Sequence, residues 1–172
     1  VDMGAGAELA IKEVNTGGNF KFGEIASTRA DSTCIDSAAA TAATERLITA
    51  DKVNAIVGGD CSGVTTAMLE NVAVANGTVM ISPGATSPAL SSVADDGIFV
   101  RTAPADARQG EIVTDILMEQ GYKNIAISYT NNDYGKGLAD SIEANFKAAG
   151  GSVTLNASHE DGKGDYGAEV AA

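Results

Sequence analysis

The chain has 172 residues, enough for one large domain or two small ones. Its net charge is −12 and its pI is about 4.3, which disfavours nucleic acid and anionic membrane surfaces as partners. Hydrophobic residues make up 44% of the chain, an ordinary share for a folded globular protein, and no apolar run approaches a membrane span. We therefore expect a folded acidic protein that neither binds nucleic acid nor inserts into a membrane.

Helical and strand-like hydrophobic periodicities alternate along the chain, and glycines end several of the predicted helices. This alternation predicts an α/β fold with doubly wound, mostly parallel sheets that carry helices on both faces. In chain order we expect a helix at about 4–15, a strand at 22–28, a helix at 36–50, a strand at 53–58, a helix at 62–75, strands at 79–82 and 98–102, a helix at 107–120, a strand at 124–129, a helix at 134–149 and a strand at 152–158.

Apolar residues at helical spacing predict the buried face of each helix. For the first three predicted helices, the expected inward residues are Met3, Ala7, Ala10, Ile11 and Val14; Ala39, Ala43, Leu47 and Ile48; and Val64, Met68, Val72 and Ala75.

The chain is expected to be truncated at both ends. It opens in a helix with no strand before it, and it ends in DYGAEVAA, which is typical of the first turns of another helix. Segment 102–106 is a predicted crossover, because Pro104 disfavours helix at the preceding residue and Asp106 is a good N-cap. We therefore expect lobe one at residues 1–103, without its first strand, and an incomplete lobe two at 104–172.

Such a fragment would expose unpaired backbone groups and apolar side chains. We expect it to self-associate or to pair with the missing part of its protein. The sequence contains no signal peptide, so we expect that a secretory leader, if the protein carries one, has been processed.

The two cysteines follow neighbouring strands of the predicted sheet. Cys34 comes after the segment GEIASTRADST, and Cys61 closes NAIVGG. A bridge between them would add roughly 3–4 kcal/mol of stability and would indicate an oxidising compartment. Two unrelated buried thiols are the alternative, and the spacing leaves both interpretations open.

Residues 59–63, Gly-Asp-Cys-Ser-Gly, fit the nucleophile elbow of a hydrolase, placed between a strand and a helix. Asp133 and His159 follow in the order nucleophile, acid, base, which predicts a cysteine-dependent α/β hydrolase as an alternative function. Glycine-rich turns of this kind occur in all doubly wound folds, however, and a disulfide at Cys61 would remove the reactive thiolate. One histidine and two separated cysteines form no zinc set, and the phosphate-binding glycine motifs are incomplete, so we expect no metal and no cofactor.

Hydroxyls and backbone amides at the carboxyl edge of the sheet suggest a different site. Ser62 begins a helix directly after a strand, where the helix dipole favours an anion. Segment 82–88, SPGATSP, presents amides and the Thr86 hydroxyl in the same crevice, where ligands of open α/β sheets usually bind. A bound carboxylate and ordinary helix capping explain these residues equally well.

A family resemblance favours the carboxylate. The segments GAELAIKEVNTGG, DSTC, IVGGDCSG, MISPGATSPAL, FVRTAPADARQG and NNDYGKGLA span nearly the whole chain. In order and spacing they resemble the type I periplasmic solute-binding proteins of ABC transporters, in the branched-chain (leucine/isoleucine/valine) amino-acid-binding family. The resemblance implies two lobes that close on an amino acid about a hinge, a periplasmic or extracytoplasmic location, no catalysis, and delivery of the ligand to a membrane permease.

The resemblance also implies roles for particular residues. Cys34 and Cys61 would form a disulfide. Ser62 and Thr86 would bind the ligand's α-carboxylate, the backbone of Gly84 and Ala85 would assist, and Tyr134 would reach over from lobe two.

Departures from the family leave the ligand open. Family members are longer, and the acidic residue that pairs with the ligand ammonium belongs to a part of lobe two that this chain lacks. Leucine, isoleucine and valine are the default ligands, with aromatic amino acids or small amides as alternatives. An extracellular amino-acid sensor domain of the same fold is the related functional alternative.

Overall fold

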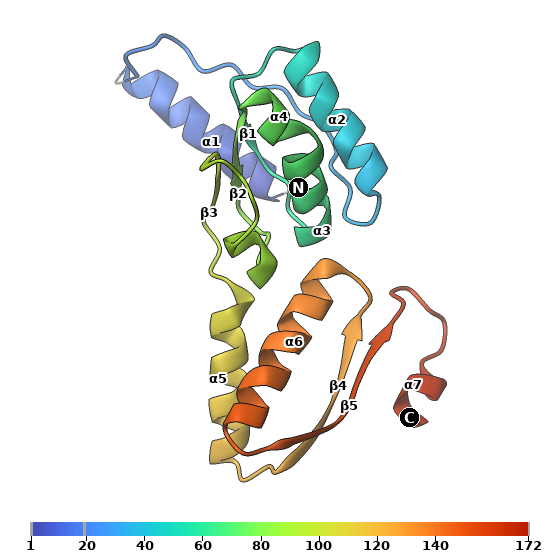
Figure 1. The fold of residues 1–172 in the computed structure, drawn as a ribbon. Coiled ribbons are helices and arrows are strands. Elements are labelled where there is room, and N and C mark those ends of the chain that lie inside the picture. The colour runs from blue at the N-terminus through green and yellow to red at the C-terminus, as the bar shows by residue number, and fades with distance from the viewer. Residues whose placement is uncertain (1, 19, 172) are drawn as a thin grey trace.

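The computed structural model describes residues 2–18 and 20–171. Two parallel sheets, each accompanied by helices, follow one another along the chain, and β3 leads directly into the long helix α5 (Figure 1). The predicted α/β fold class is confirmed.

The order of the elements follows the predicted alternation closely. The part of the chain before α5 contains α1 (Asp2–Gly17), α2 (Ser37–Thr49), β1 (Ala55–Val57), α3 (Ser62–Met68), the π-helix η1 (Leu69–Ala73), α4 (Val74–Asn76), β2 (Val79–Ser82), the 3-10 helix η2 (Pro88–Ser91) and β3 (Phe99–Arg101). It continues with α5 (Asp106–Glu119), β4 (Asn124–Thr130), α6 (Asp133–Ala148), β5 (Ser152–His159) and α7 (Gly167–Ala171).

The first sheet is three-stranded and parallel, in the order β1-β2-β3. Its register pairs Ile56 with Met80 and Met80 with Phe99, so these residues share the face that packs on α3 and η1. The core on this side consists of Ala40, Ile56, Val64, Met68, Leu69, Ala73 and Met80. On the opposite face Val57, Val79 and Val100 are 59%, 41% and 52% exposed, an apolar surface that the described residues leave open.

The helix predicted at 62–75 is present but contains a π-helical turn. A π-helix takes one more residue per turn than an α-helix, so the inward face moves along the sequence after Met68. Leu69 and Ala73 are fully buried, whereas Ala75, predicted to face inward, is exposed. The simple helical periodicity therefore fails only beyond the π-helical turn.

The second sheet is two-stranded and parallel, with β4 beside β5. Helix α6 packs on both strands, and α5 packs on α6. Phe146 of α6 is fully buried, and a Cβ at Gly151 would lie 2.2 Å from its ring. Gly110 of α5 is needed for close packing as well, because a Cβ there would lie 2.2 Å from Ser141 Oγ.

The strand predicted at 22–28 is not formed. This segment has no neighbouring strand in the described part of the chain. The side chain of Asn15 instead satisfies the backbone amide and carbonyl of one of its residues, Ile25. The Asn15 side chain donates to the Ile25 carbonyl and accepts from the Ile25 amide, both at 2.9 Å. The predicted inward face of α1 is not buried either, since Met3 and Val14 are 47% and 40% exposed.

Candidate functional site

Ser62 lies at the carboxyl end of the first sheet, at the start of α3. Its side chain is buried, and its Oγ accepts a hydrogen bond from the Ser87 amide at 3.1 Å. Because this bond uses a lone pair, the hydroxyl proton of Ser62 is left for another acceptor. Cys61, the N-cap of α3, makes no side-chain cap bond, so the first amides of the helix are also left to bind an anion.

The loop after β2 is held rigidly beside Ser62. Buried Ser82 donates to the Gly59 carbonyl at 2.6 Å and accepts from the Ala85 amide at 3.0 Å. Arg101 donates to the carbonyls of Ala85 and Ser87 at 3.2 and 2.8 Å.

These bonds decide which amides of the loop remain available. The Ala85 amide is used by Ser82, so Ala85 offers a ligand no amide proton. Within residues 2–18 and 20–171, the amides of Gly84 and Thr86 have no hydrogen-bond acceptor. They are therefore the donors that this loop presents at the carboxyl edge of the sheet.

Thr86 is bonded twice to the first residue of α5. Its hydroxyl donates to Asp106 Oδ2 at 2.7 Å, and its carbonyl accepts from the Asp106 amide at 2.9 Å. With its proton directed to Asp106, the Thr86 hydroxyl turns only lone pairs toward the crevice. Asp106 is 3% exposed, and the predicted N-cap position falls instead on Ala105.

The first turn of α6 faces the first turn of α3 across the two parts of the fold (Figure 1). A Cβ at Gly63 would lie 3.5 Å from Asp133 Oδ2. Tyr134 is the next residue and is 44% exposed. Tyr134 thus lies at the end of α6 that faces α3, and no hydrogen bond joins it to Ser62 or Thr86 among the described residues.

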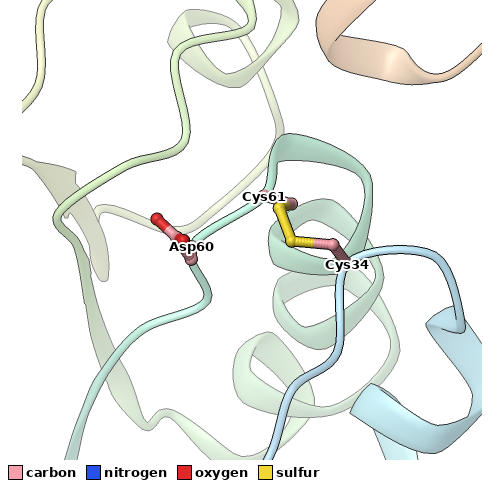
Figure 2. Close-up of side chains that lie close together, drawn as sticks. All are labelled: Cys34, Asp60 and Cys61. Atoms are coloured by element: carbon pink, nitrogen blue, oxygen red, sulfur yellow. A yellow bond between two sulfur atoms is a disulfide. The ribbon is translucent and has the colours of Figure 1, made fainter. Parts of the chain in front are cut away.

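Cys34 and Cys61 form the disulfide that the resemblance implied, with their Cα atoms 5.3 Å apart and a separation of 27 positions in sequence (Figure 2). The Cys61 sulfur is therefore not a free nucleophile. His159 lies at the end of β5, where its Nδ1 is 2.8 Å from Ser128 Oγ and its ring meets Tyr166 edge-on. The structure does not support a Cys61–Asp133–His159 triad.

Asp60 was not singled out from the sequence, yet its carboxylate lies beside this site. One of its oxygens and the two cysteine sulfurs all lie within 4.8 Å of one another. The sulfurs are bonded to each other and cannot ligate a metal as thiolates. Arg101, which holds the loop after β2, was not identified from the sequence either. Strand residues alternate between the two faces of a sheet, so the position of Arg101 on the same face as Phe99 could have marked it as a charged residue that points inward.

The groups with clearly shifted pKa values lie on the surface around the second sheet. The hydrogen bond from Lys147, and then that from Asn156, lowers the pKa of Glu143, and Lys163 lowers that of Glu169. Asp140 raises the pKa of Lys136. These are surface ion pairs on or beside helices α6 and α7. The Lys136–Asp140 pair lines a cavity together with Ser87 and Asp133, next to the Ser62–Thr86 region.

Comparison with known proteins identifies the family. The sequence model of a protein family described as "Receptor family ligand binding region" matches residues 2–168. The chain belongs to this family. As its description says, the family consists of ligand-binding regions of receptors. The family resemblance that the sequence motifs indicated is confirmed.

Several curated relatives are amino-acid-binding proteins by name. The chain is 31% identical to an amino acid binding protein of Pseudomonas aeruginosa and 30% identical to the leucine-specific-binding protein of Salmonella typhimurium, covering 96% of the chain and 44% of each relative. It is 33% identical to the Leu/Ile/Val-binding protein homolog 1 of Brucella abortus. The chain thus spans less than half the length of these relatives.

Solved structures agree in fold. The branched-chain amino acid transporter substrate-binding protein LivJ of Streptococcus pneumoniae, solved with isoleucine, is 30% identical and superposes with a TM-score of 0.81 over 96% of this chain and 46% of that one. No helix within the described residues has the length and apolar character needed to cross a membrane.

Proposed function

We propose that this chain is part of an extracytoplasmic solute-binding protein that captures a branched-chain or other hydrophobic amino acid and delivers it to an ABC transporter permease. The observation that carries the proposal is the set of unused donors at the carboxyl edge of the first sheet: the Ser62 hydroxyl and the amides of Gly84 and Thr86. The names of the relatives and the isoleucine bound to the LivJ structure support an amino acid as the ligand.

The proposed ligand geometry assigns one end of the site to each charged group of an amino acid. The Ser62 hydroxyl, the first amides of α3 and the amides of Gly84 and Thr86 bind the carboxylate. The Thr86 hydroxyl, which donates to Asp106, accepts a hydrogen bond from the ammonium group. The Gly84 and Ala85 backbone shapes the pocket floor, and Tyr134 covers the ligand from the other side.

We further propose that residues 1–103 and 104–172 belong to two lobes that close on the ligand. Binding energy then stabilises the closed arrangement over the open one. The paired bonds between Thr86 and Asp106 support this proposal, because they connect the ligand loop to the first residue of α5. The disulfide supports a periplasmic or extracytoplasmic location, since such bonds persist in oxidising compartments.

The direct test is a melting-shift and calorimetric screen of the twenty amino acids on the full-length protein. A ligand at about 100 times its Kd should stabilise the folded state by about 2.7 kcal/mol. We expect leucine, isoleucine or valine to give the largest shift. An aromatic amino acid as the best ligand would revise the specificity, and no response to any amino acid would contradict the proposed function.

An amino-acid sensor domain would use the same residues to bind its ligand. The two functions differ in the partner, so pull-down of a transporter permease by the liganded protein separates them. Retention of a permease supports the transport function.

The exposed apolar face of the first sheet suggests how the 172-residue chain behaves by itself. Val57, Val79 and Val100 lie together on this face and are largely open to solvent. Apolar surface of this kind favours association. We expect the isolated chain to elute as dimers or larger species in light-scattering chromatography, and Val57→Lys to shift it toward monomer; a clean monomer would contradict this expectation.

A further inference from the structure

Three residues, Gly58, Gly59 and Asp60, connect the end of β1 to Cys61, and Asp60 is the one among them that carries a side chain. It follows Gly58 and Gly59 and precedes Cys61, so the turn that leads from Val57 to α3 presents a single acidic group. Ser62, the proposed carboxylate donor, is two residues further along. The position of Asp60 in the fold therefore places a negative charge beside the proposed anion site.

The Asp60 carboxylate rests on the ligand loop. A Cβ at Gly84 would lie 2.0 Å from Asp60 Oδ1 and 3.0 Å from the Asp60 carbonyl oxygen, so only glycine at position 84 leaves room for this contact. Figure 2 shows the Asp60 side chain beside the disulfide, and one carboxylate oxygen lies within 4.8 Å of both sulfurs. Asp60 and the loop that presents the Gly84 and Thr86 amides thus form one surface.

This carboxylate is exposed to solvent and has no partner in the described part of the protein. Among residues 2–18 and 20–171 it has no hydrogen-bond donor and no salt-bridge partner. Arg101, the cation that holds the same loop, is committed to the carbonyls of Ala85 and Ser87 and to Ser91. An anionic ligand held by Ser62 would therefore lie near a negative charge that only solvent screens, unless the ligand itself carries a positive group.

We propose that Asp60 is a specificity-determining residue that selects zwitterionic or cationic ligands over simple carboxylic acids by binding a cationic nitrogen of the ligand. This inference rests on the proposed function and narrows it. The ligand's carboxylate lies at Ser62, and its nitrogen lies between the Asp60 carboxylate and the Thr86 hydroxyl, which both offer acceptor lone pairs. The nitrogen is either the α-ammonium of a hydrophobic amino acid or the end of a basic side chain.

The test compares Asp60→Asn with wild type in the full-length protein, using calorimetry with leucine, lysine and 4-methylpentanoate, which is leucine without its ammonium group. Asparagine keeps the size of the side chain and removes its charge. We expect leucine to bind about 10-fold or more weakly to Asp60→Asn, while 4-methylpentanoate binds equally well or better. If lysine loses more affinity than leucine, the nitrogen that Asp60 binds is the one on the side chain.

Glu70→Gln is the matched control, because it removes one exposed negative charge from η1 without touching this loop. It should leave all three affinities unchanged. Equal effects of Asp60→Asn on leucine and on 4-methylpentanoate, in a variant that melts like wild type, would overturn the inference and leave the proposed function standing. A wild-type protein that binds no amino acid would overturn both.

Discussion

Replacing Ser62 by alanine in the full-length protein should weaken leucine binding by about 10–100-fold. Hydrogen bonds to charged groups contribute about 1.5–3 kcal/mol, and each 1.4 kcal/mol is a factor of ten in affinity. The Ser62 hydroxyl accepts from the Ser87 amide and so has its proton available for a carboxylate. Isothermal calorimetry on wild type and variant measures the difference.

The same substitution also leaves the Ser87 amide without its acceptor, so a lower affinity alone does not prove contact with the ligand. A cycle with leucine methyl ester separates the two effects, because the ester lacks the carboxylate charge. If Ser62 binds the carboxylate, esterification should weaken binding to wild type much more than binding to Ser62→Ala. Equal losses in the two proteins would mean that Ser62 only supports the loop.

Ser82→Ala provides the matched control for this cycle. Ser82 is as buried as Ser62, and both of its hydrogen bonds are made inside the protein, to Gly59 and from Ala85. Its loss should destabilise the loop without changing the effect of esterification. Coupling between Ser82→Ala and esterification would indicate that the ester acts through a general distortion of the loop.

The elements that could be predicted from sequence are those with strong local signals. The helices at 107–120 and 134–149 and the strands after Ala50 appear within a few residues of their predicted bounds, because each carries a clear apolar pattern of its own. The pattern does not always mark a buried face, since Ile112 and Ile116 of α5 are 44% and 48% exposed. The local apolar pattern of residues 22–28 could not show whether this segment forms a strand. A strand exists only when a neighbour completes its hydrogen bonds, and Ile25 finds Asn15 instead.

The candidate site was partly predictable for a similar reason. Ser62 and Thr86 are marked by their positions after strands, and the structure places both at one edge of the sheet. The hydrogen-bond partners of the hydroxyl and amide protons in this region were not predictable. That Thr86 donates to Asp106, and that the Ala85 amide is taken by Ser82, depends on which groups the tertiary fold brings within hydrogen-bond distance.

Loss of the Cys34–Cys61 bond should lower the stability of the folded state by roughly 3–4 kcal/mol in the chain-entropy model, since the bond spans 27 residues. For a protein of this size that corresponds to a fall in Tm of about 6–16 °C. Thermal melts of wild type with and without reductant, and of the Cys34→Ala/Cys61→Ala variant, test this. The variant should not respond to reductant. Two reactive thiols in the denatured, unreduced wild type would contradict the bond.

The effect should be local as well as global. Segment 20–36 forms no ladder bonds, and its side-chain contacts are mainly with α1, through Asn15–Ile25 and Glu8–Arg29. Since α1 is itself largely exposed, the disulfide is the strongest tie between this segment and the buried core around α3. Reduction should therefore speed cleavage by trypsin at Lys21 and Arg29 before it affects β1, β2 and α3. Simultaneous loss of all protection would show instead that the bond holds the core itself together, because opening of one segment alone leaves the packed strands protected.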